Sequence, residues 1–381
     1  MKVFLFKWMK KSVQKGLTAN DLPPIISKME AKKQFAKLLL HWNNTQNDRH
    51  MPWKGEKNPY FIWLSEIILQ QTRVEQGLPY FLSFKQKYPT VKHLAEAKED
   101  EVMKLWQGLG YYSRARNLHE TAKNICDNLG GAFPNHFDGL IKLKGVGDYT
   151  ASAIASFAFG EKKAVVDGNV IRVLARVFGI DVASDTTEGK KKFASLAQEL
   201  IDDNEPGLYN QAIMDFGAVV CSPQNPLCDV CPFQKMCVAY QQNRIDNLPA
   251  RKKKIKVLSR YFNYLVIKSK DEIFIHKRTG NDIWKNLYEL PLLETTQPLK
   301  KNIKSAISEF LGTKDFEIST YSEGPVQLLT HRKIHAQFIE IEVQNFKKLE
   351  LAGALKVKLT MLDSYAFPKT VHFFLKLKKL V

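Results

Sequence analysis

The chain has 381 residues, more than one ordinary core needs and enough for two domains. Hydrophobic residues make up 44% and charged residues 25%, as in soluble globular proteins, and no stretch approaches the roughly 18–20 apolar residues of a membrane span. The 57 Lys and Arg against 39 Asp and Glu give a formal net charge of +18. Such a charge attracts polyanions, of which nucleic acid is the commonest soluble one, although a merely basic surface is the alternative.

The first segment, Met1–Lys11, is apolar but is interrupted by Lys2 and Lys7. It lacks the continuous apolar stretch and the small-residue cleavage site of a signal peptide. We therefore expect a cytoplasmic protein that does not associate with membranes. Thiols stay reduced in that compartment, so clustered cysteines should bind metal rather than form disulfides.

Residues 1–29 are expected to be an N-terminal extension, and residues 30–239 carry the pattern of a helical domain. Apolar residues recur at three- and four-residue steps in Ala31–Trp42 and Ile62–Gln71, which predicts two of its helices. Glycine-rich turn signals separate these segments from those that follow.

The pattern changes after residues 240–258, a predicted linker that contains the basic run Arg251–Lys254. Residues 259–381 are expected to form a smaller domain of strands with one helix at Leu299–Leu311. The predicted strands are Tyr261–Lys268, Glu272–Lys277, Ala336–Val343 and Val371–Leu377. An all-α domain followed by an α+β domain is therefore the expected fold.

Four of the five cysteines are clustered and have the spacing C-x6-C-x2-C-x5-C: Cys221, Cys228, Cys231 and Cys237. Thiolates so close in sequence can converge on one soft metal centre. Four of them suit either tetrahedral zinc or a 4Fe-4S cluster, and the ligand type alone does not decide between these. The fifth, Cys126, lies in an apolar helical stretch and is interpreted as an inert core thiol.

The segment Leu143–Ala151 resembles the hairpin of a helix-hairpin-helix motif. Gly145 and Gly147 surround one apolar residue, which lets the backbone turn tightly and leaves N–H groups facing outward. The next helix begins directly afterwards, so a DNA phosphate can be held there, and Lys144 adds a cation.

Two carboxylates stand out. Asp167 follows an apolar run and precedes a predicted helix, where it can be a simple N-cap or an acid that the helix N-terminus keeps ionised. Glu66 is a lone acid in an otherwise apolar helix, so its pKa should be raised, which suits a general acid at neutral pH.

The cysteine spacing is similar to that of the endonuclease III and MutY branch of the helix-hairpin-helix glycosylases, and the string W-L-S-E-I-I-L-Q-Q-T around Glu66 resembles MutY in particular. The resemblance implies a 4Fe-4S cluster in the loop 221–237. It also implies that Asp167 stabilises the positive charge on the sugar, or captures the sugar covalently, while Glu66 protonates N7 of the departing adenine.

The resemblance also places Tyr149 where bifunctional relatives have a lysine that forms a Schiff base. Tyrosine cannot form that imine, so we expect a monofunctional enzyme that leaves an abasic site. Tyr149 and Asn169 are expected to position Asp167 or its water, with simple packing as the alternative for each.

An enzyme that removes a base from duplex DNA must extrude the nucleotide, and side chains that fill the vacated space offset part of that cost. Gln71 and Tyr111 fall where MutY places such wedges, although a core aromatic is the alternative for the tyrosine. Gln211 lies in a segment that resembles the base pocket of the family.

MutY also has a C-terminal Nudix-like domain that recognises 8-oxoguanine, and residues 259–381 fit it through Trp284–Pro291. The signature of Nudix hydrolases is missing from Leu292–Gly312, so we expect recognition without pyrophosphatase activity. The recognition loop of the family corresponds to Leu329, Thr330 and His331, although a histidine before a strand is ordinarily a surface residue.

We therefore expect a monomeric adenine DNA glycosylase acting on double-stranded DNA that carries adenine opposite 8-oxoguanine or guanine. One alternative is another helix-hairpin-helix glycosylase, acting on pyrimidine lesions or mismatched thymine. A second, from a different class, is a non-catalytic lesion-binding protein.

Overall fold

The computed structural model describes residues 28–252, 257–329, 331–343, 346–347 and 349–381. The chain divides into two compact units, one of residues up to Arg49 with Val166–Ala250 and one of His50–Val165 with Arg251–Val381. No helix within the described ranges has both the length and the apolar character needed to cross a membrane. The predicted domain boundaries stay predictions, and most of the expected extension 1–29 lies outside the described residues.

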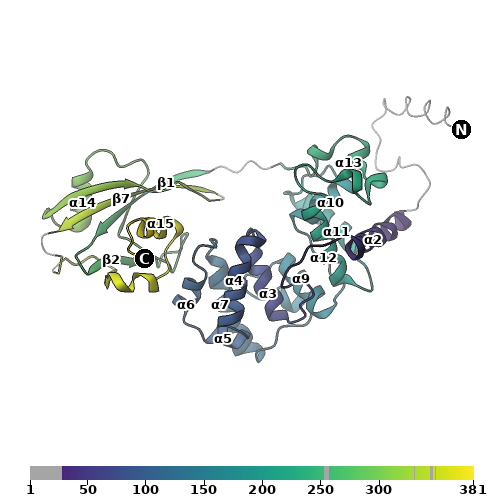
Figure 1. The fold of residues 1–381 in the computed structure, drawn as a ribbon, viewed down its shortest axis with the longest axis horizontal. Helices are drawn as coiled ribbons and strands as arrows, with labels where there is room; N and C mark the ends of the chain where they lie inside the picture. Colours follow the sequence, from purple (N-terminus) through teal and green to yellow (C-terminus); the bar gives the residue numbers. More distant parts are fainter. Residues whose placement is uncertain (1–27, 253–256, 330, 344–345, 348) are drawn as a thin grey trace. The chain divides into compact units, whose positions relative to one another are not determined.

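The first unit is helical (Figure 1). Helix α2 contacts α11 and α12, and α10 contacts α11, α12 and α13. Its elements are α2 (Lys28–Thr45), α10 (Gly168–Phe178), α11 (Thr187–Leu200), α12 (Pro206–Val219), α13 (Val238–Gln241) and the 3-10 turns η2 (Cys228–Val230), η3 (Gln234–Met236) and η4 (Ile245–Asn247).

Aromatic residues form the core of this unit. Phe35 of α2 stacks on Phe233 with ring centroids 4.5 Å apart, and Trp42 meets Phe216 of α12 edge to face at 4.9 Å. Since Phe233 lies between the cysteines, the loop that carries them is fixed to the core of the unit by a fully buried ring.

The second unit begins with a group of helices (Figure 1). Helix α3 contacts α4, α7 and α9, while α5 and α6 contact α7. The helices are α3 (Pro59–Leu69), α4 (Val74–Lys87), α5 (Val91–Glu96), α6 (Glu99–Leu105), α7 (Ser113–Leu129), α8 (Phe137–Leu140) and α9 (Asp148–Phe159). Helix α3 is buried along most of its length, as its nearly continuous apolar sequence predicts.

The same unit contains two sheets, ordered β4-β1-β7-β5 and β3-β2-β8, with β6 paired to β7. Strands β1 and β7 run parallel, and the other pairs are antiparallel. The strands are β1 (Leu258–Ile267), β2 (Glu272–Lys277), β3 (Tyr288–Glu289), β4 (Leu292–Thr295), β5 (Phe316–Glu323), β6 (Gln327–Leu328), β7 (Arg332–Val343) and β8 (Ala354–Lys358), and they are accompanied by α14 (Ile303–Leu311), η5 (Leu359–Ser364) and α15 (Lys369–Leu377).

Alternate residues of β1 enter two different cores, as the period of a strand requires. Phe262 and Tyr264 belong to the cluster that includes Phe374 of α15. Leu265 and Ile267 belong to the cluster that includes Ile307 of α14. The two helices therefore cover opposite faces of the larger sheet, and the mixed strand-helix region matches the predicted α+β class.

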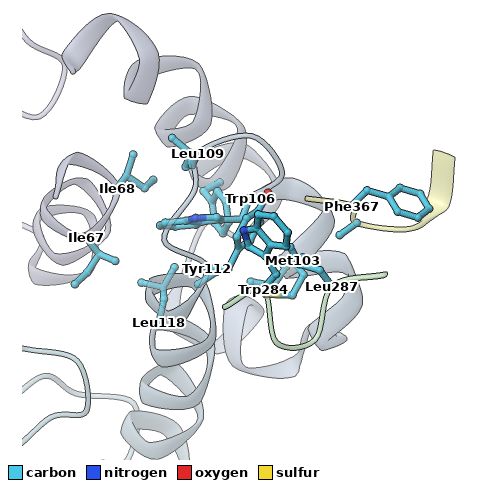
Figure 2. Packing of buried hydrophobic residues seen from close by; sticks show 14 of the residues in the cluster. Ile67, Ile68, Met103, Trp106, Leu109, Tyr112, Leu118, Trp284, Leu287 and Phe367 are labelled. Atoms are coloured by element: carbon cyan, nitrogen blue, oxygen red, sulfur yellow. The ribbon is translucent and has the colours of Figure 1, made fainter. Parts of the chain in front are cut away.

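The cluster on the α15 side also includes residues of the helical part of the unit. Figure 2 shows Met103 and Trp106, from the end of α6, beside Trp284, Leu287 and Phe367, and all five are buried. The helices and the strands of this unit thus share a continuous apolar core.

Most predicted elements are confirmed, and one is wrong. The expected strand Val371–Leu377 belongs to helix α15. Val371, Phe374 and Leu375 are buried while Phe373 and Leu377 are exposed, which is the three- and four-residue spacing of a helix face. The helix expected from Leu299 begins only at Ile303.

Candidate active site

Glu66 lies on α3 in the second unit and is only 6% exposed. Helix α3 contacts α9, whose first turn carries Tyr149. The side chain of Gln70 donates a hydrogen bond to Thr150 Oγ1 at 3.2 Å and connects the two elements. The helices of two predicted site residues are thus packed together, and the burial expected for Glu66 is present, while its raised pKa stays a prediction.

The predicted hairpin turns tightly just before α9. Gly145 has a φ of +74°, and a Cβ there would come within 2.7 Å of Asn117 Cβ, so only glycine fits without displacement. The Thr121 hydroxyl donates to the main-chain oxygen of Lys144 at 2.7 Å, and the Lys144 ammonium pairs with Glu120. Helix α7 therefore holds the hairpin in place. Gly147 then caps α9 and, like Lys144, is exposed.

Asp167 is the N-cap of α10 in the first unit, as the sequence allowed. Its Oδ1 accepts a hydrogen bond from Val170 N at 2.8 Å, and its Oδ2 accepts one from Asn169 Nδ2 at 2.9 Å. Burial nevertheless raises the pKa of Asp167, although these bonds and Arg172 act in the opposite direction. Desolvation is thus the largest influence on this pKa, and the ionised state expected for Asp167 stays a prediction.

Arg172 connects Asn169 to the cysteine loop. Its guanidinium donates to Asn169 Oδ1 at 2.9 Å and to the main-chain oxygen of Cys221 at 2.7 Å, and the side chain is only 9% exposed. Gly217 leaves room for this arrangement, because a Cβ there would lie 2.7 Å from Asn169 Cβ. The amide that holds the Asp167 carboxylate is therefore fixed by a buried cation.

The two predicted wedge residues share an unusual backbone conformation. Gln71 has a φ of +55° and Tyr111 a φ of +48°, both in the left-handed region, and both side chains are exposed. Arg114 lies buried beside both segments. Its guanidinium donates to the main-chain oxygens of Gln70 at 2.5 Å and Gly110 at 3.2 Å.

Gln211 lies on α12, and its Nε2 donates to Asp215 Oδ1 at 3.4 Å. Asp215 is fully buried and is also held by Arg49 at 2.8 Å and Asn47 at 3.0 Å. Gln211 thus lies beside an ion pair of the first unit whose carboxylate is buried.

The four clustered cysteines line one apolar cavity, together with Val177, Phe216 and Tyr240. Burial raises the pKa of Cys231 to about 12 and also raises those of Cys228 and Cys237, so these groups are thiols at neutral pH when no metal is bound. The cysteines suit a thiolate-bound iron-sulfur group. Among the described residues, no three His, Cys, Asp or Glu are grouped closely enough to hold a single metal ion.

Comparison with known proteins identifies both halves of the fold. Residues 64–201 match the family model of the HhH-GPD superfamily base excision DNA repair proteins, and residues 263–377 match the NUDIX domain. An adenine DNA glycosylase of Buchnera aphidicola subsp. Schizaphis graminum is 38% identical over 272 residues, which cover 70% of this chain and 78% of the relative. The chain belongs to the adenine DNA glycosylase family, the MutY family.

Other relatives of this adenine DNA glycosylase family member cover less of the chain. The adenine DNA glycosylase of Homo sapiens is 44% identical over 225 residues, 57% of this chain and 41% of the human protein. A solved structure of a thermostable thymine-DNA glycosylase is 31% identical, covers 55% of this chain and 97% of that one, and has a TM-score of 0.52. The predicted family and the predicted fold are therefore confirmed.

In the C-terminal region of this glycosylase, Leu329 and His331 lie between β6 and β7, whereas Thr330 lies outside the described residues. The main-chain oxygen of His331 accepts from Leu258 N at 3.1 Å, and its side chain is exposed. An exposed side chain fits a contact with DNA and also fits an ordinary surface histidine, so the role of His331 stays a prediction.

Two residues of this site were missed from the sequence. Arg114 and Arg172 are both 9% exposed and bind mainly main-chain oxygens. Every residue has a main-chain carbonyl, so the sequence does not indicate which carbonyl an arginine will bind. The available signal was an arginine on the apolar face of a predicted helix, where a cation is buried only if it is hydrogen-bonded.

Proposed function

We propose that this adenine DNA glycosylase hydrolyses the glycosidic bond of adenine paired with 8-oxoguanine or guanine in double-stranded DNA, and that it leaves an abasic site without cutting the strand. The observation that carries the chemistry is the half-buried carboxylate of Asp167, which Val170 N and Asn169 Nδ2 orient at the start of α10. An oriented anion is what an oxocarbenium-like sugar requires for its stabilisation.

The base leaves first in this mechanism. Glu66 donates a proton to N7 of adenine, the C1′–N9 bond breaks, and its electron pair leaves with the now neutral base. The burial of Glu66 on α3 suits an acid that must hold its proton at neutral pH.

The positively charged sugar then reacts with water. The Asp167 carboxylate stabilises the positive charge at C1′, or captures it as an ester, and water adds to C1′ while its proton passes to a carboxylate. Asn169 acts as a positioning residue for Asp167, since its amide bonds both the carboxylate and Arg172. Tyr149 has no amine with which to form an imine, which supports strand retention after base release.

The cysteines Cys221, Cys228, Cys231 and Cys237 would hold a 4Fe-4S cluster, which supplies a fixed, redox-capable iron-sulfur group and no step of base removal. The shared cavity of the four thiols supports this assignment over four separate thiols. Arg172 bonds both the main-chain oxygen of Cys221 and the side chain of Asn169, so a cysteine loop held by the cluster would also help to hold Asn169 in place.

DNA recognition is assigned to three groups of residues. The exposed hairpin before α9 would hold a phosphate, and the residues with left-handed backbone would fill the space of the extruded nucleotide. The loop before β7 would read 8-oxoguanine. The hairpin group is Lys144, Gly145 and Gly147. The residues that fill the vacated space are Gln71 and Tyr111, and Gln211 would contact the extruded adenine. The lesion-reading loop is Leu329, Thr330 and His331.

The test is single-turnover base release from a duplex with one central adenine opposite 8-oxoguanine, with adenine opposite thymine as control. Product is scored before and after alkali. We expect release from the lesion pair alone and strand breakage only after alkali. Breakage before alkali would refute the monofunctional assignment.

The similarity to a thymine-DNA glycosylase at 31% identity favours one alternative, the removal of mismatched thymine. A duplex with a G·T mismatch therefore belongs in the same experiment. Thymine release without adenine release would replace the proposed substrate, and tight binding without any release would favour the lesion-binding protein.

A further inference from the structure

Gln107 connects the loop that carries Tyr111 to the C-terminal region of the second unit, residues 257–381. It lies between α6 and the segment Gly108–Tyr112, and its Oε1 accepts a hydrogen bond from Phe367 N at 3.1 Å. Its Nε2 lies 2.9 Å from His372 Nδ1 on α15. Burial lowers the pKa of His372, so the ring is neutral at physiological pH and its Nδ1 can accept the amide proton.

The segment that follows Gln107 is held in a demanding conformation. Gly108, Gly110 and Tyr111 all have positive φ, which for a tyrosine costs energy that surrounding contacts must offset. Trp106 Nε1 donates to the main-chain oxygen of Gly110 at 3.0 Å, and Tyr80 Oη donates to that of Gln107 at 2.8 Å. The backbone is thus fixed at both ends of the turn that presents Tyr111.

Apolar packing reinforces these bonds from the same side. Trp106 is fully buried in the cluster that also contains Leu287 and Phe367, and Figure 2 shows members of this cluster from both parts of the unit. The residue that bonds Gly110 therefore belongs to the same apolar cluster as the C-terminal segment that bonds Gln107. Polar and apolar contacts of the C-terminal region converge on one turn.

We propose that Gln107 is a positioning residue through which the C-terminal region holds Tyr111 in its wedge conformation, so that the region proposed to read the lesion also supports extrusion of the base. This inference rests on the proposed function, in which Tyr111 fills the vacated space. Without the Gln107 bonds, the turn keeps its contacts with Trp106 and Arg114 but loses its link to the C-terminal region, so Tyr111 leaves the left-handed region more often.

The test is a double-mutant cycle on single-turnover adenine release from the 8-oxoguanine pair, with Gln107→Ala, Tyr111→Ala and the double variant. We expect each single variant to slow release by about tenfold, and the double variant to be no slower than Tyr111→Ala. Gln107→Glu keeps the acceptor for Phe367 N and should restore part of the rate. Lys104→Ala removes the pair of Lys104 with Asp363 in the same region, and should stay within about twofold of the wild type.

The outcomes separate the two claims. Multiplicative losses in the double variant would overturn the coupling, because Gln107 would then act independently of Tyr111. A wild-type rate in Tyr111→Ala would refute the wedge itself, and with it this inference. An equal loss in Lys104→Ala would show that general loosening of the C-terminal region, rather than Gln107, slows release and would also overturn the proposal.

Discussion

Arg114 donates a hydrogen bond to the main-chain oxygen of Gln70 at 2.5 Å, directly before the left-handed residue Gln71. The same guanidinium reaches the main-chain oxygen of Gly110, directly before Tyr111. One buried cation thus fixes the backbone ahead of both predicted wedge residues, although the two are forty positions apart in sequence.

The bonds of Arg114 to the main-chain oxygens of Gln70 and Gly110 form a two-pronged bridge, the Arg114 fork. Replacing Arg114 should let the segments of Gln71 and Tyr111 move independently. Arg114→Lys keeps the charge but replaces the two guanidinium nitrogens, which reach the oxygens of Gln70 and Gly110 separately, with one ammonium nitrogen on a flexible stem. We expect single-turnover release to fall by about tenfold. Arg116→Lys on the same helix is the matched control, since Arg116 donates to one oxygen, that of Lys285, which lysine can also reach. Equal losses in both variants would contradict the role of the fork.

Asp167→Asn should stabilise the protein while it abolishes activity. Burial raises the pKa of Asp167 above its ordinary value of 3.8, so the contribution of this group to stability is fully present below 3.8 and is lost as pH rises through the folded pKa. Ionisation of the side chain therefore costs stability, and asparagine removes that cost while it can still accept the N-cap bond from Val170 N. We expect a higher melting temperature and base release reduced by more than roughly 100-fold. A lower melting temperature would show that the carboxylate is a structural cap.

The sequence predicted the elements whose period is unambiguous. Strands β1 and β2 were recognisable because they are short runs rich in aromatic and β-branched residues, and α3 because it is almost entirely apolar. Val371–Leu377 failed because V-H-F-F-L-K-L is short enough to satisfy both periods, and only the buried positions decide for a helix.

The sequence predicted which residues belong to the candidate site but not the contacts between them. The motifs identified Asp167 and its neighbour Asn169, and the cap geometry followed from their spacing. Neither the dominance of burial over the helix N-terminus nor the bridge from Asn169 through Arg172 to Cys221 could be predicted, since both depend on how distant segments pack.

The cysteine loop predicts a metal content that can be measured. Purified protein should contain about four iron and four sulfide per chain. Cys231→Ser should lose most of both, whereas Cys126→Ser, outside the cavity, should keep them. One zinc per chain, or iron that persists unchanged in Cys231→Ser, would refute the assignment.

Glu289 should give the stability of the protein a measurable pH dependence. Burial raises its pKa from 4.5 to about 7, although Arg278 donates to its Oε1 at 2.7 Å. The folded state therefore holds a proton that the unfolded state loses, and the contribution of Glu289 falls as pH rises from 4.5 to about 7. Relative to Glu289→Gln, the free energy of unfolding of the wild type should fall by on the order of 3 kcal/mol across this interval. Parallel curves in urea denaturation would contradict this.

The most direct test of the account is adenine release by Glu66→Gln from the 8-oxoguanine pair, measured in a single turnover beside its affinity for the same duplex. Glutamine preserves the shape of the buried side chain but cannot donate the proton to N7. The account predicts affinity within a few-fold of the wild type and release slower by at least roughly 100-fold. Full release by Glu66→Gln would contradict the assignment of Glu66 as the acid and the mechanism built on it.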